Sequence, residues 1–150
     1  MTPFRAAGLC SRIEDGREAA WFPPERGHRT AEQIRKADMI CRRCPVCDQC
    51  ISFGLVYAGH EDYATYGGMR RKELQALARM MRRDGLDMRR RKGGKEQRYR
   101  QAVDWLDRHP EAVREAKREA LGYWKDHYRR RSGTRSGDTD EPARLEASPA

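Results

Sequence analysis

The sequence predicts an all-α fold, in which a small helical domain is followed by a basic helical extension. Apolar residues recur at the three- and four-residue spacing of helices in several stretches, and no convincing strand is found. Only nineteen of the 150 residues are Leu, Ile, Val or Phe, which is too few for a Rossmann domain, a barrel or a β-sandwich. Five cysteines, four of them within ten residues, indicate that a metal centre replaces part of the core.

Proline and glycine set the limits of the first helices. Thr30 begins a helix that ends near Cys44. Pro45 disfavours helical geometry in the residue before it and suits the first position of the next helix, which runs to about Ala58 before Gly59 stops it. We therefore expect two helices with a sharp break between them.

The second half of the chain is expected to be helical and basic. Gly67-Gly68 predicts a tight turn, because only glycine enters positive φ at little cost. Over the whole chain we expect four regions: the metal-binding domain over 1–83, a basic glycine-flanked linker over 84–94, a basic helical hairpin over 95–131 and a disordered tail over 132–150.

The apolar segments of the chain are short, which bears on its cellular location. No apolar run approaches the roughly 18 residues of a membrane span, and the N-terminus lacks the apolar stretch of a signal peptide. We expect a cytoplasmic protein without a membrane partner. An odd number of clustered cysteines in a reducing compartment indicates a metal site rather than a disulfide framework.

The spacing of the clustered cysteines requires a break in the helix. On one straight helix, Cys41 and Cys50 would face opposite sides. A bend at Pro45 lets thiolates from both helices share a centre, and Cys10 joins as a remote ligand if the N-terminus folds back. Four thiolates suit either a zinc ion or an iron–sulfur cluster. Because only four are needed, one of Cys47 and Cys50 is spare.

Charge is concentrated in one stretch of the chain. Residues 70–131 hold 21 basic and ten acidic side chains, whereas residues 1–69 are balanced. Such density favours phosphate contacts with DNA or RNA, although a solvated face remains the alternative. No recognition-helix signature indicates base-specific reading. The candidate DNA-binding residues are Arg70, Arg71, Lys72, Arg79, Arg82, Arg83, Arg89, Arg90, Arg91 and Lys92.

The ordered motifs over residues 10–83 resemble the WhiB-like family of actinobacteria and their phages. Cys10 stands thirty residues before the pattern Cys41-x2-Cys44-x5-Cys50, and Pro45 follows the third cysteine as in the family. Trp21-Phe22-Pro23-Pro24 is similar to the family's aromatic-proline segment. Residues 64–73, ATYGGMRRKE, are similar to its Gly-Gly turn before a basic helix.

The resemblance implies an iron–sulfur transcription regulator. It implies a 4Fe–4S cluster on Cys10, Cys41, Cys44 and Cys50, and binding to domain 4 of the primary sigma factor. Some family members sense nitric oxide or oxygen through the cluster. The chain departs from the family in having Tyr66 where the family has Trp, in the additional Cys47, and in the helices after residue 95. The partner-binding residues implied are Trp21, Phe22, Tyr66, Gly67 and Gly68.

The cysteine pattern also fits two functions other than an iron–sulfur regulator. One is a structural zinc module with a nucleic-acid-binding extension, and the other is a thiol–disulfide reductase that uses a C-x2-C pair. The reductase lacks the βαβ setting of thioredoxin-like pairs, and no catalytic arrangement of Ser, His and acidic residues is found, so we do not expect an enzyme. The Gly-Gly turn also has an alternative interpretation as a packed connection between helices.

Overall fold

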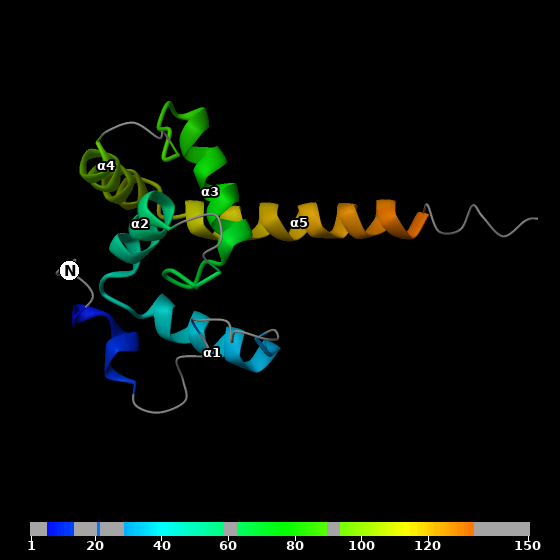
Figure 1. Ribbon diagram of the computed structural model, residues 1–150, viewed down its shortest axis with the longest axis horizontal. Coiled ribbons are helices and arrows are strands. Elements are labelled where there is room, and N and C mark those ends of the chain that lie inside the picture. The colour runs from blue at the N-terminus through cyan, green and yellow to red at the C-terminus, as the bar shows by residue number, and fades with distance from the viewer. Residues whose placement is uncertain (1–5, 14–20, 22–28, 59–62, 90–93, 134–150) are drawn as a thin grey trace, which may run out of the picture. The chain divides into compact units, whose positions relative to one another are not determined.

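The structure is a computed structural model that describes residues 6–13, 21, 29–58, 63–89 and 94–133 (Figure 1). These residues are all-α, as predicted, and within them the only β pairing is one isolated bridge between Tyr66 and Met69. The elements are the 3-10 helix η2 (Leu9–Arg12), α1 (Ala31–Arg42), α2 (Cys47–Tyr57), α3 (Arg71–Arg83), α4 (Lys95–Arg108) and α5 (Ala112–Gly133).

The break between α1 and α2 lies where Pro45 predicts it. Thr30 caps α1: its Oγ1 accepts a hydrogen bond from the Gln33 N–H at 3.1 Å, and the Gln33 side chain accepts one from the Thr30 N–H at 2.8 Å. The α2 helix begins at Cys47, two residues later than expected, because Val46 has φ −113° and ψ 27°, outside helical geometry.

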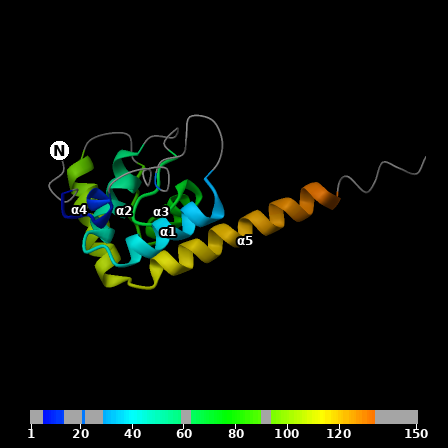
Figure 2. The ribbon, with the colours of Figure 1, turned by 90° about the horizontal axis from the view of Figure 1, so that it is seen from below.

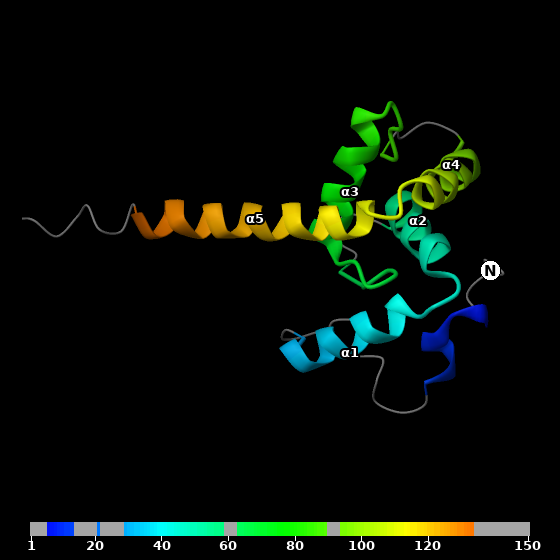
Figure 3. The same ribbon diagram turned by 180° about the vertical axis from the view of Figure 1, so that it is seen from behind.

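One apolar core joins α2, α3, α4 and the beginning of α5. Ile51, Leu77, Met81 and Trp105 belong to the same buried cluster. On α5, the core positions are the small residues Ala112, Ala116 and Ala120, which are spaced four apart and lie on one face. Figure 2 shows α2 beside α4, and Figure 3 shows α5 beginning beside α3.

The observed division of the chain differs from the expected one. The first compact unit comprises residues 1–120 and the second comprises residues 121–150, whereas the sequence suggested a boundary over 84–94. The Trp105 indole donates a hydrogen bond to Asp84 Oδ2 at 2.8 Å, and Met88 is buried in the core. The described part of the expected linker is therefore packed against the helices that follow it.

Helical spacing in the sequence predicts that Leu121, Trp124 and Tyr128 face inward on the last helix, and this prediction is wrong. Leu121, Trp124 and Tyr128 are exposed along α5, with Trp124 39% exposed. Ser132 and Gly133 extend this helix, although the sequence placed them in the disordered tail, and residues 134–150 lie outside the described residues. None of the described helices is both long enough and apolar enough to cross a bilayer.

Candidate metal centre

Four cysteine thiols lie around the break between α1 and α2. Cys41 is buried near the end of α1, Cys44 is in the connecting turn, and Cys47 and Cys50 occupy the first turn of α2. Cys10 is exposed on η2. None of the five forms a disulfide. The break therefore distributes the clustered cysteines over the end of α1, the connecting turn and the start of α2.

The Gly67-Gly68 turn lies against the start of α2. Both glycines have positive φ, 57° and 77°, as a type I′ turn requires. The Sγ of Cys47 is 3.5 Å from the Gly67 carbonyl oxygen, and the Gly67 backbone also hydrogen bonds to Cys50. A Cβ on Gly67 would lie only 2.5 Å from Ile51 Cγ1. The turn therefore contacts the side chains of Cys47 and Cys50. The close approach to Ile51 leaves room only for glycine at position 67.

Burial makes the thiols hard to ionise without a cation. Burial raises the pKa of Cys47 and that of Cys50 to about 12, and it also raises the pKa of Cys41. The negative charges of neighbouring cysteines contribute to the same upward shifts, less than burial does. The charge of Cys10 acts on Cys41 and Cys50, so the N-terminal thiol belongs to the same electrostatic environment. A bound metal centre would relieve this cost, because its positive charge stabilises thiolates.

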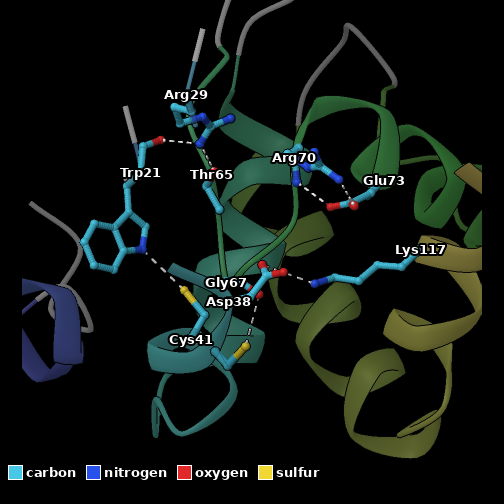
Figure 4. Close-up of polar contacts among 10 residues, drawn as sticks. Trp21, Arg29, Asp38, Cys41, Thr65, Gly67, Arg70, Glu73 and Lys117 are labelled. Atoms are coloured by element: carbon cyan, nitrogen blue, oxygen red, sulfur yellow. Dashed lines mark hydrogen bonds and ion pairs between the residues drawn. The ribbon is translucent and has the colours of Figure 1, made fainter. Parts of the chain in front are cut away.

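Cys41 has the most closely defined surroundings. The Trp21 indole donates a hydrogen bond to its Sγ at 3.4 Å, which lowers the Cys41 pKa and opposes the effect of burial (Figure 4). The Trp21 carbonyl in turn accepts hydrogen bonds from the Thr65 N–H at 2.7 Å and from Arg29 at 3.1 Å. Buried Trp21 therefore links Cys41 to Thr65, which lies in the segment that leads into the Gly-Gly turn.

The donor set fits a thiolate-held iron–sulfur cluster. Four cysteines from η2, α1, the connecting turn and α2 supply the sulfur ligands that such a cluster requires. Across the described residues, no group of three His, Cys, Asp or Glu side chains is close enough to hold a metal ion. Four thiolates also suit a tetrahedral zinc ion, so the chemistry of the donor set fits both kinds of centre.

The expected partner-binding residues occupy two kinds of environment. Trp21 is buried at 6% exposure, so it supports Cys41 rather than presenting a contact surface. Tyr66 is half-buried, and its ring lies 6.0 Å from that of Phe53. Gly67 and Gly68 are buried within the turn. Phe22 lies outside the described residues.

The expected DNA-binding residues also separate into groups. Arg79 and Arg83 both pair with Glu119 of α5, and Arg70 pairs with Glu73. These arginines therefore have structural partners. Arg82 is near an acidic side chain, Asp87, at 3.8 Å, and Arg71 lies 5.2 Å from the centre of the Tyr63 ring. Lys72 and Arg89 are exposed. Arg90, Arg91 and Lys92 lie outside the described residues.

Sequence reasoning missed three charged residues near the thiols. Arg29 donates hydrogen bonds to the Trp21 carbonyl, the Tyr63 carbonyl and the Thr65 hydroxyl. Asp38 pairs with Lys117 at 3.5 Å. Asp38 precedes Cys41 by three residues and so lies on the same face of α1, but the sequence carries no signal for Lys117, which reaches this face from α5.

Comparison with known proteins assigns the family. The model of the family described as "Transcription factor WhiB" matches residues 4–77. The redox-responsive transcriptional regulator WhiB3 of Mycolicibacterium smegmatis is 35% identical over 72 residues, which cover 47% of this chain and 70% of the relative.

Two further relatives carry a transcription-regulator name. The transcriptional regulator WhiB1 of Mycobacterium tuberculosis is 36% identical over 59 residues, covering 39% of this chain and 68% of the relative. WhiB1 of Bifidobacterium longum is 32% identical over 76 residues, covering 51% and 77%. No solved structure matches the chain significantly. With its cysteine spacing, its glycine turn and these relatives, the chain belongs to the WhiB family of transcription factors.

Proposed function

We propose that this chain is a redox-responsive transcription regulator in which Cys10, Cys41, Cys44 and Cys50 hold a 4Fe–4S cluster. The observation that carries the proposal is the placement of Cys41 and Cys50 against the Gly67-Gly68 turn, with Cys10 and Cys44 near enough for their charges to act on both thiols. A relative named as redox-responsive supports the regulatory part of the proposal.

Cys47 is the thiol that this proposal leaves out. Its Sγ lies 3.5 Å from the Gly67 carbonyl oxygen. The side chain also packs against the main apolar core, as a small buried hydrophobe does. We therefore assign the fourth ligand position to Cys50 and a packing role to Cys47.

The cluster supplies an oxidant-sensitive group that links separate parts of the chain. The residues of this chain keep that centre in place: Trp21 donates a hydrogen bond to Cys41, and the turn backbone bonds to Cys50. Without a bound cluster, η2, α1 and α2 would lack the thiolate link that Cys10, Cys41, Cys44 and Cys50 would otherwise provide. The partner and DNA contacts then change because the surfaces that carry them are no longer held together.

We assign partner binding to the outer side of the Gly-Gly turn, with domain 4 of the primary sigma factor as the partner. The Tyr66 ring lies tilted against that of Phe53, and the Arg71 guanidinium lies over the ring of exposed Tyr63. The test is a pull-down of the sigma factor with Tyr66→Ala, using Tyr128→Ala as a matched control on an exposed tyrosine of the second unit. Selective loss of binding in Tyr66→Ala supports the assignment, and equal binding in both variants refutes it.

DNA binding is assigned to exposed basic side chains in the segment that follows the Gly-Gly turn. Lys72 and Arg89 are exposed, whereas Arg79 and Arg83 hold Glu119. Contacts of this kind are to phosphates, so affinity must fall steeply as salt rises. Binding of duplex DNA measured over a salt series tests this assignment, and an affinity that does not depend on salt would contradict it.

The cluster itself is tested by iron and sulfide analysis of anaerobically purified protein and its five single Cys→Ala variants. We expect about four iron and four sulfide per chain in the parent and in Cys47→Ala, and little of either in the other four variants. Colourless protein with one zinc ion would instead support a structural zinc module.

The five Cys→Ala variants also test the reductase alternative. Burial raises the pKa of Cys47 to about 12, which leaves almost no thiolate at neutral pH, and the thiolate is the nucleophile in disulfide exchange. We therefore expect no insulin reduction that depends on Cys44 and Cys47. Reduction that survives in Cys10→Ala and requires one C-x2-C pair would overturn the assignment.

A further inference from the structure

A lysine side chain of α5 contacts α1 near Cys41. Lys117 Nζ lies 3.5 Å from Asp38 Oδ1, and both side chains are largely shielded, with 26% and 30% of their surface exposed (Figure 4). Asp38 lies almost one helical turn before Cys41 on the same face of α1. A side chain of the C-terminal extension therefore holds the helix that carries a cluster ligand.

Gly68 fixes how closely these groups approach. A Cβ built on Gly68 would lie 3.2 Å from the Cβ of Cys41, 3.4 Å from Asp38 Oδ1 and 3.7 Å from Lys117 Nζ. The thiol-bearing residue, the carboxylate and the ammonium group therefore surround one point on the turn. Because the turn has no side chain there, α1 and α5 can both pack against its backbone.

The apolar packing explains why this contact matters. Ala37 and Cys41 of α1 form a small cluster with Trp21, and this cluster is separate from the main core. The α5 residues Ala112 and Ala116 belong to the main core. Burial of apolar surface thus fixes α5 against α3 but gives α1 little hold on the main core, so the position of α1 depends on the metal centre and on polar links.

We propose that Asp38 and Lys117 are positioning residues for the metal centre, so that docking of α5 stabilises the cluster and the cluster stabilises docking of α5. The proposal rests on the cluster assigned above. Coupling between two sites is reciprocal in free energy. An ion pair that helps to hold Cys41 in place must therefore also transmit the state of the cluster to the first two turns of α5.

The contacts of α5 with α3 are independent of this pair. Glu119 accepts hydrogen bonds from Arg79 at 3.0 and 3.1 Å, and it lies 3.5 Å from Arg83. These contacts hold α5 to the main core whether or not a cluster is bound. Glu119→Gln therefore separates general loosening of α5 from loss of the link to α1.

The test measures how fast the cluster is lost from the full-length holoprotein when a chelator and air are added. We expect Lys117→Met and Asp38→Asn each to accelerate the loss of cluster absorbance by about threefold, as for an ion pair of modest strength. The double variant should be no faster than either single variant, because one interaction is removed in all three. Arg118→Met is the matched control, since Arg118 is exposed on the next position of α5.

A second readout follows α5 itself. Hydrogen exchange over residues 112–120 should rise when the cluster is removed from the parent, and it should rise less in Lys117→Met. The charge-reversed pair Asp38→Lys with Lys117→Asp should restore part of the parent's slow cluster loss. Unchanged rates in the single variants, or purely additive rates in the double variant, would overturn the coupling. If the parent binds no cluster at all, the proposed function fails and the coupling fails with it.

Discussion

The close approach at Gly67 gives the largest stability change that a single small substitution should produce. In Gly67→Ala the residue keeps φ near 57°, and its new Cβ meets Ile51 Cγ1 at 2.5 Å and the Cys47 carbonyl oxygen at 2.9 Å. The left-handed conformation costs an alanine about 1–2 kcal/mol. Overpacking against a buried side chain and backbone adds about 1–3 kcal/mol, so we expect a total loss of about 2–5 kcal/mol.

Two other glycines separate these contributions. Gly85 has φ 87° with nothing within 4 Å of its Cβ position, so Gly85→Ala should show the conformational cost alone. Gly122 has open space and lies within α5, so Gly122→Ala should be neutral or stabilising by up to about 1 kcal/mol. Urea unfolding followed by circular dichroism under one set of anaerobic conditions gives the three values. A loss in Gly67→Ala no larger than that in Gly85→Ala would refute the packing of the turn.

Three further predictions concern other parts of the chain. In metal-free protein, iodoacetamide should alkylate Cys47 and Cys50 slowly near neutral pH, and the rates should keep rising above about pH 9, because burial raises both pKa values and the thiolate is the reactive form; rates that level off near pH 9 would contradict this. Trp105→Phe removes the indole hydrogen bond to Asp84 and should cost about 1 kcal/mol in unfolding free energy; an unchanged melting temperature would count against that bond. Lys72→Met should lower the slope of log affinity for DNA against log salt by about one, and an unchanged slope would remove Lys72 from the phosphate contacts.

Local signals in the sequence predicted local structure well. Thr30 caps α1, and the break near Pro45 separates α1 from α2, as expected. These features depend on the conformations of neighbouring residues and on caps, which a short window of sequence contains. On α3, the apolar spacing of the sequence predicts one buried stripe that includes Leu74 and Leu77, and both residues are buried.

The sequence was less informative about α2 and α5, where several faces looked alike. On α2 the sequence favoured a stripe through Phe53 and Tyr57, whereas Ile51 and Leu55 are the more deeply buried. That helix carries apolar residues on most of its surface, so periodicity does not select one face. On α5, Trp124 has core-like spacing but is exposed, because spacing alone does not supply a partner for that face.

Tertiary contacts of charged residues could not be predicted at all. Arg79 and Arg83 look like DNA-binding residues in the sequence, yet both contact Glu119, which lies about forty positions away along the chain. Lys117 is one basic residue among many in α5, and its role depends on Asp38 being brought near by the fold. Charge density identifies a basic region, but the ion pairs within it depend on packing between distant helices.

The central claim is that a metal centre holds α1 against the rest of the first unit. Hydrogen exchange of matched cluster-containing and cluster-free protein tests it most directly. Because Ala37 and Cys41 lie in a small apolar cluster separate from the main core, we predict that α1 loses protection without the cluster while α3 and α4 keep most of theirs. Equal protection of α1 in the two forms, together with equal helicity and protease resistance, would contradict the account.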